Sequence, residues 1–358
     1  MKFKTLTYIT FGTFIAAILV FLFLITHMFS TWRASRFQEL QSGSELLEFN
    51  DKMIEVAVVG NDKNAPALLL IHCGAGGYDQ ALALAGNLDT AGFRIIAPSR
   101  PGYLRTPLAE GLLPEHQARL MREMLKELDI KKVSVFAFAE GAFSACILAL
   151  ENPDLVESLI LLSPILETKG RELPPGLRAL DEITGDVGAW WLYRKSEAAK
   201  PRKLFKSVFE LTQEFPPGIQ RYETIEGIIE DPARKENFEK FLQSMTPVSP
   251  REDGTRNDDI QLTQPPRIPY GKISCPVLII GGENDILLPK GSVAKIAERF
   301  AKNSNLELKL YSNSGFLVPM GDQYEEYRND LISFLTKNIK TLPTPMKPSG
   351  GYSLEPIK

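Results

Sequence analysis

Few side chains in this sequence could carry out acid–base or nucleophilic chemistry. The 358 residues include only three histidines, which are His27, His72 and His116. Cys73 directly follows His72, and a thiol beside an imidazole is one arrangement that activates a nucleophile. Glu140 stands between a strand-like run and a helix-like run, where a carboxylate could act as a base or a nucleophile. These residues define the chemistry that the sequence leaves open.

The same kinds of residue also have ordinary structural roles. A buried cysteine behaves as a small hydrophobic residue, and the helix dipole stabilises an acidic residue in the first turn of a helix. Ser144 falls one turn into the helix after Glu140, where we expect it to pack. Asp285 follows the apolar run 276–280, and an aspartate there can close a strand through an Asx turn. Structural roles are therefore our first interpretation of Cys73, Glu140, Ser144 and Asp285.

Strands and helices alternate along the part of the chain that positions these residues. Val133–Phe138 alternates β-branched and aromatic residues and predicts a short buried strand, and the stretch from Glu140 to Glu151 predicts a helix. Further strands are predicted at 53–59, 67–71, 94–97, 159–162, 276–280 and 306–311. This alternation predicts an α/β fold with a mostly parallel central sheet and helices on both faces.

The alternation stops between about residues 167 and 271. Aromatic residues fall there in polar-flanked helical segments, which predicts a helical insertion packed on the sheet domain. We place the two parts of the sheet domain at 51–166 and 272–340. The polar stretch 252–264 predicts a loop, and the Pro/Gly-rich tail 341–358 predicts disorder.

The N-terminus predicts a single membrane-spanning helix. No Lys, Arg, Asp or Glu occurs from Thr5 to Trp32, a length that crosses a ~30 Å hydrocarbon core. A cleaved signal peptide has an apolar region of about 7–15 residues and a small-residue cleavage site, and this segment fits that pattern less well. We assign 1–32 to the anchor and 33–50 to a juxtamembrane connector. Basic residues flank the helix on both sides and hardly set its orientation, and we place the folded domain on the non-cytoplasmic side.

Composition argues against several other classes of protein. The net charge is −3 and the basic residues are scattered, so we expect no nucleic-acid partner. The three cysteines lie in or beside predicted buried elements and show no metal-ligand spacing. We therefore expect no metal site, no cofactor and no disulfide framework.

Several motifs resemble the α/β-hydrolase superfamily and occur in the order that the family has them. Ile71–Gln80, Arg94–Leu108 and Val133–Ala145 look like bacterial hydrolases with an HGAGGGYDQG…PSRxGYLRTP…GxSAGxxSA pattern. Arg251–Asp258 is similar to the end of the cap region of these enzymes. The resemblance covers roughly residues 50–337, and it implies an α/β-hydrolase fold with the insertion 167–271 as its cap.

The resemblance also implies a Ser, Asp/Glu, His triad in chain order, and this chain departs from it at two positions. The serine position is Ala139, the acid position is Asp285, and the histidine position is Phe316. A methyl group cannot attack a carbonyl carbon, and a phenyl ring cannot accept the proton. The triad histidine comes last in the chain, whereas His72 precedes Ala139 and Asp285, so His72 cannot take that role. In the family, a histidine at the position of His72 commonly bonds the loop backbone. We therefore expect a hydrolase-like pseudoenzyme without serine-hydrolase activity.

The resemblance implies that a binding pocket is kept. The loop that begins at Cys73 and Gly74, together with the amide of Glu140, would hold a carbonyl oxygen or a carboxylate. Ala139 and Phe316 make the predicted pocket more apolar. We therefore expect a small apolar ligand or a protein partner.

Two alternatives stay open. One is an esterase-like hydrolase that uses a non-standard site around Glu140, Cys73 and Asp285. The other is a membrane-tethered scaffold in which the pocket has no role.

Overall fold

An eight-stranded sheet forms the centre of the body in a computed structural model that describes residues 2–60, 62–86, 88, 91–166, 185–191, 194, 201–215 and 220–339. The strands are β1 (Glu45–Phe49), β2 (Lys52–Val59), β3 (Ala67–Ile71), β4 (Arg94–Pro98), β5 (Val133–Phe138), β6 (Val156–Leu162), β7 (Val277–Gly282) and β8 (Leu306–Tyr311). Their order is β1-β2-β4-β3-β5-β6-β7-β8. The strands from β4 to β8 pair in parallel, and β1 and β2 are antiparallel additions at one edge.

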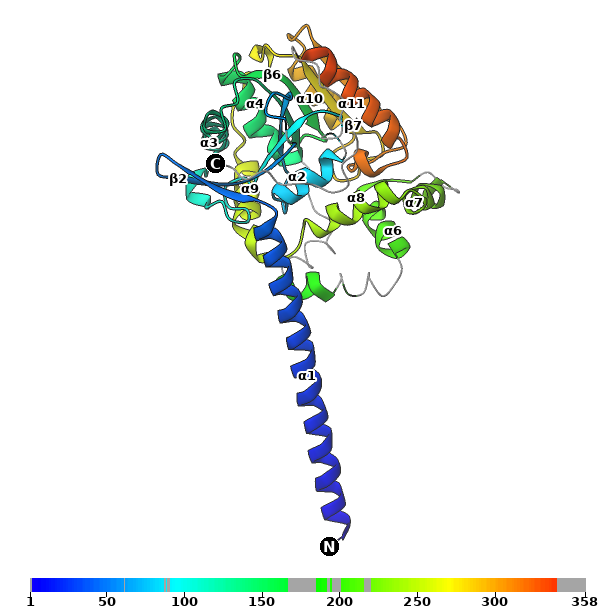
Figure 1. Cartoon of the computed structure of the whole chain (residues 1–358). Coiled ribbons are helices and arrows are strands. Elements are labelled where there is room, and N and C mark those ends of the chain that lie inside the picture. The colour runs from blue at the N-terminus through cyan, green and yellow to red at the C-terminus, as the bar shows by residue number, and fades with distance from the viewer. Residues whose placement is uncertain are drawn as a thin grey trace.

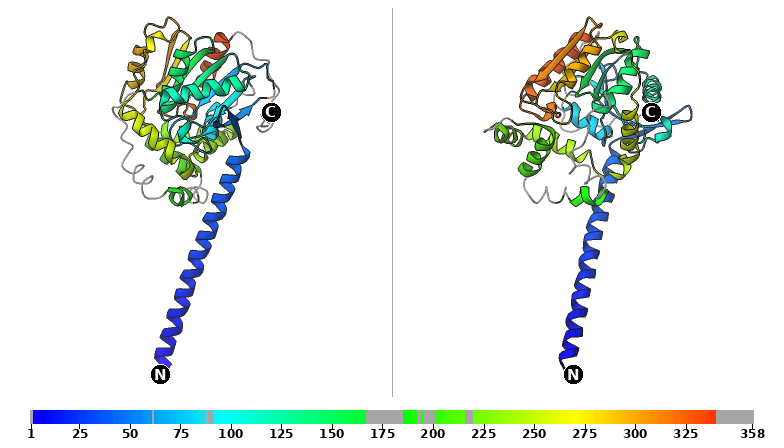
Figure 2. Two further views of the ribbon diagram at one scale, coloured as in Figure 1. Left: turned by 90° about the vertical axis from the view of Figure 1, so that its left-hand side faces the viewer. Right: turned by 180° about the vertical axis from the view of Figure 1, so that it is seen from behind.

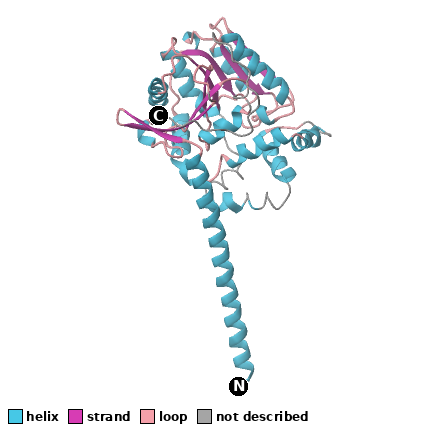
Figure 3. Cartoon of the chain, viewed as in Figure 1, coloured by secondary structure: helices cyan, strands magenta, loops and turns pink. Residues whose placement is uncertain are grey.

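Helices cover both faces of this sheet, as Figures 1, 2 and 3 show. Those of the sheet domain are α2 (Tyr78–Ala85), α3 (Pro114–Glu127), α4 (Ala142–Glu151), α10 (Ser292–Arg299) and α11 (Tyr324–Asn338). Every residue of the central strand β5 is buried. A strand that is covered on both faces reads as a continuous apolar run, which is why β5 and its neighbours lack polar alternation. The structure confirms the predicted α/β class with a mostly parallel sheet.

The insertion contributes helices that lie over one end of the sheet domain (Figure 1). They are α6 (Pro201–Thr212), α7 (Gln220–Glu230), α8 (Pro232–Gln243) and α9 (Glu252–Thr263), with a helical stretch at 185–191. Residues 167–184 and the tail 341–358 fall outside the described residues. The loop predicted at 252–264 is wrong, because α9 occupies it. Its buried residues are Gly254, Asn257 and Asp258, so its sequence has no apolar periodicity.

The helix α1 (Lys2–Ser42) projects from the body as a long rod (Figures 1 and 2). By length and composition, Phe11–Ser42 could cross a membrane, and an N-terminal signal sequence can pass the same test. The range 33–50, predicted as a connector, contains the last turns of α1 and the edge strand β1. Leu40 is part of the hydrophobic core, and the Tyr78 hydroxyl donates to its carbonyl at 2.7 Å. The C-terminal end of α1 is therefore docked on the body.

Candidate functional site

The turn after β5 has the backbone of a nucleophile elbow with alanine at its tip. Ala139 has φ of 48°, in the left-handed region, between the extended Phe138 and the helical residues that lead into α4. A Cβ at Gly141 would lie 2.8 Å from the His72 carbonyl oxygen, so only glycine fits there. A non-glycine residue in this conformation is strained, and such strain is typical of the elbow that presents a catalytic serine.

The three triad positions lie beyond the carboxyl ends of three parallel strands of the sheet, where α/β folds place their sites. Ala139 follows β5, Asp285 follows β7 and Phe316 follows β8. The last two loops touch, because the Asn284 N–H donates to the Ser314 carbonyl at 3.0 Å. The structure thus brings together the positions that the resemblance assigned to the triad.

Phe316, at the position that the resemblance assigns to the histidine, packs against the residue that precedes the elbow. Its ring lies against Phe138, the residue before Ala139, with ring centroids 5.0 Å apart. Phe241 of α8 meets Phe138 from the insertion at 6.4 Å. All three side chains are buried. This cluster therefore covers the elbow with apolar rings that cannot transfer a proton.

Asp285 is held by the backbone of its own loop. Its Oδ1 accepts the N–H groups of Leu287 and Leu288 at 2.7 and 3.0 Å, the bonding of an Asx turn. Among the described residues, Oδ2 has no hydrogen-bond donor. Burial raises the pKa of Asp285 to about 6, although the two backbone N–H groups lower it. An acid in this state has no imidazole to orient.

Glu140 turns its carboxylate onto the glycine-rich loop. Gly74 donates its backbone N–H to Glu140 Oε2 at 2.9 Å, and Glu140 is 4 % exposed. Gly74 stands in the loop that supplies the oxyanion hole in this kind of fold. The expectation of available donors in this loop is therefore corrected, because this N–H already holds a carboxylate. The Cys73 N–H also has a partner, Gln80 Oε1 at 3.0 Å.

His72 and Cys73 do not form a nucleophile–base pair. His72 Nδ1 donates to the Cys73 carbonyl at 2.7 Å, and Nε2 accepts the Arg100 N–H at 2.8 Å, so both ring nitrogens bond backbone. Burial and the nearby Arg100 hold the pKa of His72 well below its usual value. The Cys73 thiol donates to the Gly74 carbonyl at 3.1 Å. The imidazole is therefore a neutral structural bridge between two loops.

Buried ion pairs connect the remaining motifs of the resemblance, and no local sequence pattern predicts them. Arg100 donates two hydrogen bonds to Asp258 of α9, at 2.8 and 2.5 Å, and the Tyr103 hydroxyl donates to the same carboxylate. Arg251 binds Asp79 at 2.9 Å. The only sequence signal was the joint occurrence of these motifs, because each pair joins residues more than 150 positions apart.

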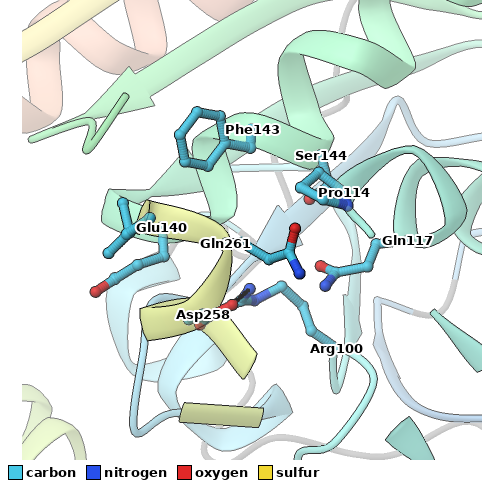
Figure 4. A pocket seen from close by; sticks show the side chains of 9 residues that line it. Arg100, Pro114, Gln117, Glu140, Phe143, Ser144, Asp258 and Gln261 are labelled. Atoms are coloured by element: carbon cyan, nitrogen blue, oxygen red, sulfur yellow. Dashed lines mark hydrogen bonds and ion pairs between the residues drawn. The ribbon is translucent and has the colours of Figure 1, made fainter. Parts of the chain in front are cut away.

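A small cavity lies between Glu140 and this network (Figure 4). Its volume is about 10 Å³, enough for about one water. In Figure 4 the polar ends of Gln117, Gln261 and Arg100 converge on one side, whereas the Glu140 carboxylate points away from them. Within the described residues, no cluster of three or more His, Cys, Asp or Glu side chains could hold a metal ion. Glu140 and Ser144 both line this water-sized space, and the Ser144 hydroxyl donates to the Gly141 carbonyl at 3.2 Å.

Comparisons with known proteins agree with this geometry. Residues 66–322 match the family model of the alpha/beta hydrolase fold. The chain is 25 % identical over 298 residues to the uncharacterized hydrolase YcgS of Bacillus subtilis (strain 168). The aligned region covers 81 % of this chain and 98 % of that protein. It is 22 % identical over 301 residues to a 2-hydroxy-6-oxononadienedioate/2-hydroxy-6-oxononatrienedioate hydrolase of Paraburkholderia xenovorans (strain LB400), covering 82 % and 96 %.

Solved structures show the same fold at low sequence identity. An alpha/beta hydrolase fold protein from Nakamurella multipartita superposes with a TM-score of 0.72 at 23 % identity, covering 82 % of this chain and 98 % of that one. A thermophilic esterase from Thermogutta terrifontis superposes with a TM-score of 0.57 at 19 % identity, covering 82 % and 98 %.

Proposed function

The chain belongs to the α/β-hydrolase family, and we propose that it is a membrane-anchored member that has lost serine-hydrolase chemistry and acts by binding. The observation that carries this proposal is the elbow. Its backbone is strained at Ala139, as it is in an elbow that presents a nucleophile, but the side chain at this position is only a methyl group. Phe316 stands at the second position that the reaction needs. Losing both groups removes the attack and the proton transfer together.

The anchor is supported by α1. Its exposed apolar side chains between residues 11 and 28 would be costly in water and are suited to a hydrocarbon core. We place the body on the non-cytoplasmic side, which is tested by adding protease to sealed vesicles of known sidedness. Digestion of the body only from the cytoplasmic face would reverse this orientation.

The bound partner that we propose is a small apolar ligand or a protein that contacts the cap. The rings of Phe138, Phe241 and Phe316 give the region over the elbow an apolar character. A ligand held there would need no acid–base group. Binding of such a ligand to the folded state would raise the melting temperature of the chain.

The test of lost chemistry uses the full-length chain, purified in detergent. The unmodified protein is expected to take up no serine-directed fluorophosphonate probe and to release no p-nitrophenol from p-nitrophenyl esters. The A139S/E140A/F316H variant is expected to do both, because it restores the serine, the histidine and the alanine of the GxSAG pattern. Labelling of the unmodified chain would contradict the proposal.

A second candidate function is supported by Glu140. Glu140 lines a cavity of about 10 Å³, and its carboxylate, once turned from the Gly74 N–H toward that space, could act as a general base on a single water. If the unmodified chain hydrolyses an ester, this candidate predicts that E140Q abolishes the activity and that C73A keeps it. Survival of the activity in E140Q would exclude Glu140 as the base.

A further inference from the structure

The three tryptophans of the chain gather where α1 meets the body. Trp32 of α1 stacks on Phe29 with ring centroids 6.1 Å apart, and Trp190 meets the same phenyl ring edge-on at 5.8 Å. Trp190 and Trp191 belong to the helical stretch 185–191 of the insertion. Figure 1 shows this stretch, in green, beside α1 on the side of the body that faces the N-terminus. Segments far apart in sequence thus form one aromatic cluster.

Polar contacts fix the level of this stretch along α1. Arg33 Nε donates to Asp186 Oδ2 at 2.9 Å, and Asp186 also accepts the Ser249 N–H at 2.9 Å. Arg33 is the first charged residue after the uncharged segment 5–32. Trp190 contacts Phe29, which lies four residues, or about 6 Å, further into that segment. The stretch therefore runs from the charged end of the segment toward its apolar part.

The outer face of the stretch is apolar. Val187 and Trp191 are four residues apart and share one side of a helix, and they are 57 % and 53 % exposed. Trp190, on the inner side, is 5 % exposed. Tryptophan is enriched at the membrane–water interface, where its ring meets both the acyl region and the headgroups. The exposed pair therefore has the chemistry of an interfacial contact.

Contacts between the C-terminal end of α1 and the body hold the face formed by Val187 and Trp191 at a fixed position along α1. A Cβ at Gly43 would lie 2.3 Å from the Tyr78 hydroxyl oxygen, so the chain passes tightly against α2. The Tyr78 hydroxyl bonds the Leu40 carbonyl, and Arg36 donates to the Gln243 carbonyl at 3.2 Å. These contacts hold the last turns of α1 against both the sheet domain and the insertion.

We propose that the face formed by Val187 and Trp191 lies in the interfacial layer of the phospholipid bilayer that α1 spans, so that the cap is seated on the membrane. This inference rests on the proposed membrane anchor. It identifies the partner of this face as the headgroup–acyl boundary of the lipid. The described part of the cap then lies between the membrane and the sheet domain.

The experiment places a polarity-sensitive fluorophore on single introduced cysteines of the full-length chain in phosphatidylcholine vesicles. V187C reports on the cap face, L24C on the exposed side of α1, and L308C on β8, at the sheet edge opposite β1. The three native cysteines are buried, and the unmodified chain measures their background labelling. Lipids brominated along the acyl chain quench only fluorophores that reach the bilayer.

The expected result is quenching at residues 24 and 187 and no quenching at residue 308. Quenching at 24 but not at 187 would overturn the inference while the anchor stands, and the cap face would then be available to a protein partner. Absence of quenching at 24 would overturn the anchor and the inference together.

Discussion

At the residue scale, the carboxylate of Glu140 binds a backbone donor of the glycine-rich loop that follows β3. Its Oε2 accepts the Gly74 N–H at 2.9 Å, so this donor is engaged by a side chain of the same protein. Acyl transfer builds negative charge at this position, and donors aimed at that charge lower the barrier. The Glu140 carboxylate engages one such donor, the Gly74 N–H, and would repel the developing negative charge. Under the proposed loss of serine-hydrolase chemistry, Glu140 is therefore a third departure from the family pattern, beside Ala139 and Phe316.

We expect the A139S/F316H variant to remain far slower than A139S/E140A/F316H. Removal of one oxyanion-hole donor costs about 10²–10³ in kcat, so the triple variant should exceed the double variant by about 100-fold or more. The measurement is kcat/KM for a p-nitrophenyl ester, with E140A alone as the control that stays silent. Equal rates for the double and triple variants would show that Glu140 does not block the site.

Asp285 predicts a pH dependence of stability. Its folded-state pKa of about 6 exceeds the ordinary 3.8, so the folded chain binds this proton more tightly than the unfolded chain. The free energy of unfolding should therefore fall as pH rises from about 4 to about 6, by at most ~3 kcal/mol, and this contribution should be constant at higher pH. D285N keeps the Oδ1 acceptor and should abolish this slope.

Urea denaturation between pH 4 and 7 measures the effect of D285N. E283Q is the matched control, because Glu283 is an exposed acid in the same loop. Parallel curves for D285N and the unmodified chain would contradict the assignment of this slope to Asp285.

At the scale of elements, the β5–α4 turn has a strained backbone at an alanine. Ala139 has φ of 48°, whereas Ala142, three residues later, has φ of −62° in the helical region. Both residues are fully buried, so they differ mainly in backbone conformation. Glycine relieves the strain at the first position and only adds unfolded-state entropy at the second.

We therefore expect A139G to be more stable than A142G by about 1–2 kcal/mol in free energy of unfolding. The A142G change should destabilise the chain by about 1 kcal/mol, because glycine gives the unfolded chain more conformational freedom, which is lost when the helix forms. Urea unfolding of the two variants beside the unmodified chain gives both values. Equal losses at the two positions would mean that the elbow stores no strain at Ala139.

At the scale of the whole molecule, the end of α1 belongs to the folded body as well as to the proposed anchor. Arg36 and Leu40 contact the insertion and the core, respectively, and Tyr78 bonds the Leu40 carbonyl. A chain that begins at Arg33 keeps these contacts, whereas a chain that begins at Gly43 loses them. The connector assigned from sequence thus includes residues that the body uses for its own stability.

We expect the chain that begins at Gly43 to be less stable than the one that begins at Arg33 by about 3 kcal/mol. This estimate combines the burial of one leucine with one or two buried hydrogen bonds. Y78F in the longer chain isolates the bond to Leu40 and should cost about 1 kcal/mol. Identical urea midpoints and slopes for the two chains would refute the docking of α1.

The sequence by itself determined seven strands of the sheet and the positions around the elbow, whereas β1 lies in the range predicted as a connector. The buried runs of β5 to β7 and the ordered motifs around Gly74, Ala139, Asp285 and Phe316 are local patterns, and periodicity or loop chemistry predicts them directly. The identity of a residue also decides what it cannot do, so the missing hydroxyl and imidazole were evident before any geometry was available.

The tertiary structure alone decided which polar groups meet. The bond from Gly74 to Glu140, the pair of Arg100 with Asp258 and the docking of Leu40 all join residues distant in sequence. The helix α9 was misread as a loop for the same reason, because its buried face is polar and is satisfied by partners from other segments. Apolar burial leaves a periodic signal along the chain, whereas a buried hydrogen bond or ion pair has none until both partners are placed in space.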